Sequence, residues 1–100
     1  MAKLQSYVNI STNTTTIVSK VPCRLVKIVN NKAGASANTA TVYDNTAGSG
    51  TKIATIDTTQ ASVSEWGYNC NCDTGLTVVT ATGTAADITV IIGPYQDDSA

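Results

Sequence analysis

The chain has 100 residues, a formal net charge of −1, no histidine and only 13% charged residues. This length fits a single domain with a thin core, and charges are about half as frequent as the roughly 25% of ordinary soluble domains. The near-neutral balance and the scattered basic residues argue against nucleic acid as a partner. No apolar run approaches the about 20 residues that cross a membrane, so a membrane is not expected as a partner either.

The polar residues indicate the fold class. Threonine contributes 17 residues, and threonine, serine and asparagine together contribute 33. Threonine is β-branched and suits a pleated strand, whereas the straight-chain residues that favour helices are scarce. Short apolar and threonine-rich runs alternate with Gly, Asn, Asp and Ser, which is the pattern of an all-β, antiparallel sandwich or small barrel.

The alternation predicts eight short strands, at residues 7–10, 14–19, 24–30, 39–43, 52–56, 62–68, 76–80 and 88–92. The run at 24–30 is apolar on both faces, which is typical of a central strand. Because no connection is long enough for a helical crossover, neighbouring strands are expected to form antiparallel hairpins. We expect the first strand to pair with the second, the fourth with the fifth around the glycine-rich turn 44–50, and the seventh with the eighth across 82–87.

The order of the strands stays open, because a jelly roll, an immunoglobulin-like sandwich and a small barrel all fit this strand count. A set of fewer, longer strands that pair between chains also stays open. Residues 69–75 are expected to form an irregular turn that holds two cysteines. We interpret residues 1–100 as one β domain, with 1–6 and 96–100 as flexible ends.

The residue types argue against catalysis. The absence of histidine removes the commonest general base and excludes Ser–His and Cys–His pairs. Asp44, Asp73 and Asp87 each lie in a predicted turn, where a carboxylate accepts backbone hydrogen bonds. A hydrolase would need two facing carboxylates, and a calcium loop would need several acidic residues, whereas 44–50 has one. We therefore expect no enzyme, no cofactor and no metal; a small hydrolase with paired carboxylates is the competing class.

The three cysteines, Cys23, Cys70 and Cys72, do not form a zinc motif. Structural zinc takes four ligands, with two to four residues between paired cysteines. The start of the chain lacks the apolar segment of a signal peptide, so we expect synthesis in a cytosol, where thiols stay reduced. Small, partly buried thiols are one interpretation. A disulfide from Cys23 to Cys70 or Cys72, formed after release into an oxidising medium, is the other.

Trp66 and Tyr68 are the candidate partner-binding residues. They are two positions apart, so on a strand their side chains share one face. Such an aromatic pair can stack on a sugar ring or anchor a protein partner. The competing interpretation is a core tryptophan with a tyrosine at the strand end, since the chain has no phenylalanine to fill its core.

Two segments carry a resemblance. The first is residues 41–56 (TVYDNTAGSGTKIATI), and the second is residues 74–80 (TGLTVVT) leading through 83–90 (GTAADITV). Over roughly residues 24–92 the chain resembles small virion proteins of tailed bacteriophages, of the kind found as capsid decoration or cement proteins and head fibres. The segment at 69–72 (NCNC) departs from this pattern, and no binding residue is carried over.

The resemblance implies a β-sandwich or β-barrel on the capsid exterior of a virion, made in the host cytoplasm. It implies a homo-oligomer, with a trimer at local three-fold positions favoured, whose partner is the major capsid protein or another virion protein. The expected role is to clamp neighbouring capsid subunits and reinforce the shell. A neck, tail or head-fibre component, and an adhesin module that binds carbohydrate or a cell surface, are the alternatives.

Overall fold

The computed structural model describes residues 5–62 and 64–96, and every regular element within these ranges is a strand. The strands are β1 (Ser6–Ile10), β2 (Thr15–Ser19), β3 (Cys23–Lys32), β4 (Thr39–Asp44), β5 (Thr51–Asp57), β6 (Glu65–Cys72), β7 (Leu76–Ala81) and β8 (Asp87–Pro94). The all-β class and the eight strands predicted from the sequence are therefore confirmed.

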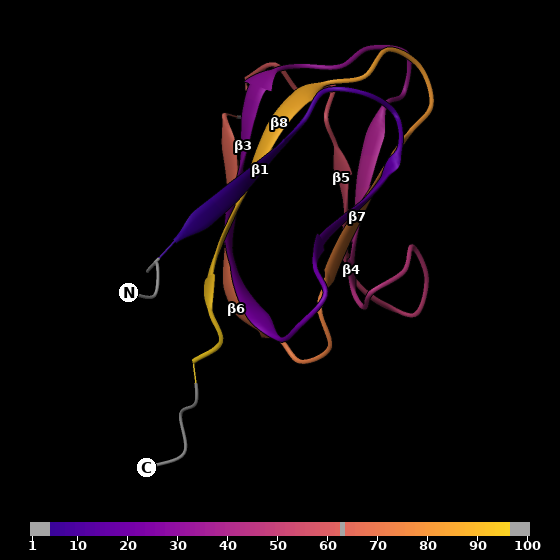
Figure 1. Ribbon diagram of the computed structural model, residues 1–100. Helices are drawn as coiled ribbons and strands as arrows, with labels where there is room; N and C mark the ends of the chain where they lie inside the picture. Colours follow the sequence, from indigo (N-terminus) through magenta and orange to yellow (C-terminus); the bar gives the residue numbers. More distant parts are fainter. Residues whose placement is uncertain (1–4, 63, 97–100) are drawn as a thin grey trace.

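The strands form two four-stranded antiparallel sheets that face each other (Figure 1). Sheet A has the order β1-β8-β3-β6, and sheet B has the order β2-β7-β4-β5. Each strand in the first half of the chain therefore pairs with its mirror in the second half: β1 with β8, β2 with β7, β3 with β6 and β4 with β5. This is the topology of an eight-stranded jelly roll.

The core lies between the sheets and consists of aliphatic side chains together with Cys23 and Cys72. In β8, Ile88 and Val90 are fully buried, whereas Thr89 between them faces outward. This alternation with a period of two places one face of each sheet in the core. The largest fully buried apolar side chains come from both sheets, and they are Leu25, Ile28, Val42, Leu76, Val78, Ile88 and Val90.

The predicted central strand is confirmed, and two of the predicted hairpins are wrong. β3 lies between β6 and β8. β4 and β5 form a hairpin as predicted, but β1 does not pair with β2, and β7 does not pair with β8, because the members of each pair belong to different sheets. The pairing predicted from the order of strands in the chain is wrong here, because the loops that join these strands cross from one sheet to the other instead of turning back within one sheet.

The predicted irregular turn at 69–75 is also wrong over its first half, because β6 continues to Cys72. The register of β3 against β6 shifts between Leu25 and Lys27, so that Cys70 pairs with Leu25 and Gly67 with Lys27. Asn69 lies within this bulge with a positive φ of 49°, a conformation that asparagine tolerates better than most residues. The polar NCNC segment is therefore a bulged strand.

A buried asparagine joins the loops at one end of the sandwich. Asn38, in the β3–β4 loop, is fully buried. Its amide nitrogen donates to the side-chain oxygen of Asn13 (2.8 Å) in the β1–β2 loop and to the carbonyl of Thr82 (2.8 Å) in the β7–β8 loop. Its amide oxygen accepts the hydroxyl of Thr58 (2.5 Å) in the β5–β6 loop and the N–H of Ala86 (3.3 Å). All the loops at this end thus meet at one side chain.

A glycine allows two of these loops to approach closely. Gly83 has a φ of 57°, and a methyl group there would lie 2.2 Å from the carbonyl oxygens of Ala35 and Ser36. Next to it, Ala35 and Thr84 exchange backbone hydrogen bonds of 3.1 and 2.9 Å. No larger residue fits this position, because its Cβ would overlap backbone that cannot move aside.

The ends of the chain are described only in part. Residues 1–4 and 97–100, which include most of the predicted flexible ends, lie outside the described residues. Ser6 already belongs to β1. Gln96 exchanges hydrogen bonds with Asn71, whose amide donates to the Gln96 carbonyl (2.6 Å) and whose side-chain oxygen accepts the Gln96 N–H (3.0 Å).

We expect Asn38→Ala to lower the free energy of unfolding by about 2–4 kcal/mol, because it leaves the Ala86 N–H and the Thr58 hydroxyl buried with fewer acceptors. Urea denaturation followed by circular dichroism measures the loss. Asn31→Ala, which removes an exposed asparagine, is the control and should cost about 1 kcal/mol or less. Equal losses in the two variants would contradict the role of Asn38.

Candidate functional site: the outer face of sheet A

The outer face of sheet B is partly covered by the chain itself. The β4–β5 loop folds back onto it, so that a methyl group at Gly48 would lie 2.8 Å from Cγ2 of Val79. The Thr77 hydroxyl holds this loop by donating to the carbonyl of Asn45 (2.9 Å). Among the residues that the structure describes, no such loop lies over the outer face of sheet A in Figure 1. The outer face of sheet A is therefore the more open of the two.

Two rows of cross-strand neighbours make up the outer face of sheet A. They run from β1 through β8 and β3 to β6, and they are Tyr7–Ile91–Lys27–Gly67 and Asn9–Thr89–Val29–Glu65. Lys27 and Glu65 form a salt bridge of 3.3 Å at the β3–β6 side. Added atoms at the Cβ position of Gly67 would meet nothing within 4 Å, so this side of the face is open.

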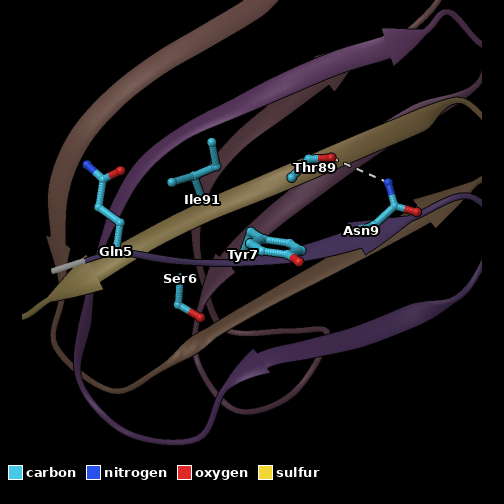
Figure 2. Close-up of a pocket in the computed structure, with 6 residues that line it drawn as sticks. All are labelled: Gln5, Ser6, Tyr7, Asn9, Thr89 and Ile91. Carbon is cyan, nitrogen blue, oxygen red and sulfur yellow. Dashed lines mark hydrogen bonds between the residues drawn. The ribbon is translucent and has the colours of Figure 1, made fainter. Parts of the chain in front are cut away.

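The β1–β8 side of this face holds a shallow depression that we call the Tyr7 depression. Figure 2 shows the Tyr7 ring between Ile91 and Gln5 on one side and Thr89 and Asn9 on the other. The Tyr7 side chain is 72% exposed. The complete lining is Gln5, Ser6, Tyr7, Asn9, Thr89 and Ile91, and it contains no charged residue. An exposed aromatic ring in an uncharged setting is cheap to desolvate, so this is a candidate contact site.

A rigid polar cluster borders the depression. The amide nitrogen of Asn9 donates to the carboxylate of Asp87 (2.7 Å), and that of Asn31 donates to the hydroxyl of Thr89 (2.9 Å). Asn31 also donates to the same oxygen of Asp87 (3.3 Å). These bonds link polar groups from β1, β3 and β8, and two of the linked residues, Asn9 and Thr89, line the depression.

The predicted binding residues Trp66 and Tyr68 lie elsewhere. Both are on β6, the edge strand at the opposite side of sheet A, and both are half-buried and pack against the core. Burial raises the pKa of the Tyr68 hydroxyl. These contacts give both residues a packing role, and their role in binding a partner stays a prediction.

Asp44 has the turn role predicted for it. Its carboxylate accepts the backbone N–H groups of Asp73 (3.0 Å), Thr74 (2.9 Å) and Gly75 (3.4 Å), and so it caps the β6–β7 turn. A carboxylate that receives three N–H donors is arranged for hydrogen bonding, not for a cation. Asp73 accepts the hydroxyl of Tyr95 (2.7 Å), and Asp87 belongs to the polar cluster described above.

In residues 5–62 and 64–96, no group of three or more Cys, Asp or Glu side chains is placed to hold a metal ion. The same part of the chain contains no helix long and apolar enough to cross a membrane. The three cysteines are free thiols; Cys23 and Cys72 are buried, and Cys70 is half-buried.

Sequence reasoning missed the residue that the structure makes most prominent. Tyr7 was assigned to a strand, but its exposure follows from the position of β1 at the edge of sheet A and from the open outer face beside it. The local signal was the alternation of β1, in which Tyr7 shares one face with the polar Asn9, while Val8 and Ile10 share the other face.

Comparison with known proteins does not assign the site. No protein-family model matches the chain, and no curated protein shows significant similarity to it.

We expect Trp66→Ala to lower the free energy of unfolding by about 2 kcal/mol or more, because it removes a ring that packs against the core. Tyr7→Ala should change it by no more than about 0.5 kcal/mol, because the side chain is mostly exposed. Urea denaturation followed by far-ultraviolet circular dichroism compares the two without relying on the lost tryptophan. A Trp66→Ala variant as stable as the unchanged chain would contradict the packing role of this ring.

Proposed function

We propose that the chain is a structural component of a virion that decorates the capsid exterior and reinforces the shell. In this proposal the outer face of sheet A lies against the major capsid protein, and Tyr7 is its anchor. The observation that carries the proposal is the Tyr7 depression, where a 72% exposed tyrosine sits beside Ile91 within an uncharged lining. Interface centres are depleted in charge and enriched in tyrosine.

The rest of the outer face of sheet A fits a contact that several copies of the chain make together. Gly67 keeps the β6 side open, and Lys27 and Glu65 neutralise each other by their salt bridge. A single copy of a 100-residue chain offers only a modest contact area. Joining several copies into one oligomer, for which the phage resemblance implies a trimer, multiplies the attachment to the shell by avidity.

The jelly-roll topology supports a place on a virion. Jelly rolls recur in viral capsid proteins and in lectins, but a fold alone does not assign a function. The resemblance to phage decoration proteins favours the first of these settings, with synthesis in the host cytoplasm and a final place on the virion. A neck, tail or head-fibre position would use the same face.

A saccharide-binding adhesin module is the second candidate, because of the polar cluster beside Tyr7. A sugar ring can stack on an exposed tyrosine, and the polar side chains of Asn9 and Thr89 in the lining can bond its hydroxyls. The depression, of about 400 Å³, is large enough for a small ligand. This candidate keeps the binding mode first considered for Trp66 and Tyr68 but moves it to the other edge of the sheet.

Cosedimentation with capsids of the parent virus that lack this chain tests the proposal. We expect Tyr7→Ala to weaken binding at least about tenfold, the effect of losing a hot-spot aromatic. Gly67→Gln should also weaken it, because the new side chain projects from the contact face without disturbing the fold. Ile17→Ala removes an exposed apolar side chain on sheet B and should bind as the unchanged chain does.

Three measurements decide between the candidates. Light scattering after size-exclusion chromatography gives the oligomeric state, and cryo-microscopy of the intact particle gives the location. A glycan array tests the adhesin. A chain that fails to bind capsids, or a Tyr7→Ala variant that binds them at full strength, would overturn the proposal. Glycan binding that is lost in Asn9→Ala would establish the second candidate instead.

A further inference from the structure

We infer that Cys23 and Cys72 are a disulfide-forming pair that closes when the protein meets an oxidant, and that Cys70 stays a free thiol. The inference concerns the inner face of sheet A, and it does not rest on the proposed function. Sequence alone left the partner of Cys23 open between Cys70 and Cys72.

The register between β3 and β6 determines which cysteine can form a disulfide with Cys23. Cys23 on β3 lies directly opposite Cys72 on β6. Directly opposite residues of antiparallel strands have Cα atoms about 4.5 or 5.5 Å apart, and both values fall within the range of about 4.4–6.8 Å that a disulfide spans. Both side chains are buried, so they point to the same side of the sheet, into the core.

The register also excludes Cys70. Cys70 lies opposite Leu25 and is therefore diagonal to Cys23, at a Cα distance of about 7–8 Å that a disulfide does not span. Cys70 and Cys72 are neighbours on one face of β6, where residues two apart are separated by about 6.6 Å. Their Cβ atoms point the same way and stay that far apart, whereas a disulfide needs them at about 3.5–4.5 Å.

The two thiols already interact. The Cys72 thiol donates a hydrogen bond to the Cys23 sulfur, and this bond is the main reason that the pKa of Cys23 is lowered to about 7. The same bond, together with burial, raises the pKa of Cys72. Cys23 is thus the thiol that becomes a thiolate first and attacks the oxidant.

A peroxide completes the reaction with balanced electrons. The Cys23 thiolate attacks one oxygen of hydrogen peroxide, the O–O bond breaks, and a sulfenic acid and hydroxide form. The Cys72 sulfur then attacks the Cys23 sulfur, the S–O bond breaks, and the departing hydroxide takes the Cys72 proton as water. In sum, two thiols are oxidised to one disulfide while the peroxide is reduced to two waters.

The disulfide would join the central strand β3 to the edge strand β6. It closes a loop over residues 24–71, and long closed loops remove much entropy from the unfolded chain. We expect the melting temperature to rise on the order of 10 °C. A chain made in a reducing cytosol would thus fold with free thiols and gain this link only after release, and its outer face would be unchanged.

Peroxide treatment of the purified, reduced protein tests the inference. Intact-mass spectrometry should show the loss of two hydrogens, and non-reducing digestion with trypsin should link residues 21–24 to residues 53–100. Because no Lys or Arg follows Lys52, that peptide contains both Cys70 and Cys72. Alkylation before digestion, followed by fragmentation, should find the free thiol at Cys70.

Two variants sharpen the assignment. In Cys70→Ser, peroxide should still form the disulfide and raise the melting temperature as much as in the unchanged chain. In Cys72→Ser, peroxide should form no disulfide and leave the melting temperature unchanged. If Cys72→Ser does not fold, the alkylation map of the unchanged chain still decides. A link from Cys23 to Cys70, a disulfide between chains, or oxidation that ends at sulfinic acid would overturn the inference. None of these results depends on capsid binding.

Discussion

The sandwich depends on one buried amide. Asn38 is fully enclosed, and its donors and acceptors join the loops β1–β2, β3–β4, β5–β6 and β7–β8. Loops normally lie on the surface, because water satisfies their backbone groups. Here the polar groups are satisfied by each other, so these loops can pack closely at this end of the sandwich. Such a network stabilises only when complete, because each unpaired member is costly in a low-dielectric interior.

Because of the mirror pairing of strands, the two outer faces differ in how far the chain covers them. The β4–β5 loop is the one direct hairpin among the described strands, and it bends back over sheet B near Val79. The first and last strands, β1 and β8, lie side by side in sheet A instead, and Tyr7 on β1 is 72% exposed. The surface proposed for binding is thus what the winding of the chain leaves open, while the cysteine pair lies on the inner side of the same sheet.

Sequence patterns predicted the strands and the one hairpin that depend on neighbouring residues, and they missed the features that depend on residues far apart in the chain. The alternation around Ile88 and the apolar run of β3 identified strands, and the glycine-rich segment identified the β4–β5 hairpin. The remaining pairings depend on segments far apart in the chain, so neighbouring strands were paired wrongly. Nothing near Asn38 distinguishes it from the exposed Asn31, since burial is decided by four loops meeting. Tyr7 was missed for a related reason: the alternation of β1 places it opposite to Val8 and Ile10, but only the arrangement of the strands leaves its face of the sheet open.

The short connection at residues 45–50 has a consequence for how the chain reaches its native state. From this turn the pairs β4–β5, β3–β6, β2–β7 and β1–β8 are nested one around the next. Closing a long loop costs more entropy than closing a short one, but each inner pair shortens the effective separation of the next. Assembly from the middle of the chain outward is therefore the cheapest route, and such a non-local topology folds slowly, in about milliseconds to seconds. By this route β1, the edge strand that bears Tyr7, pairs with β8 as the last step of folding.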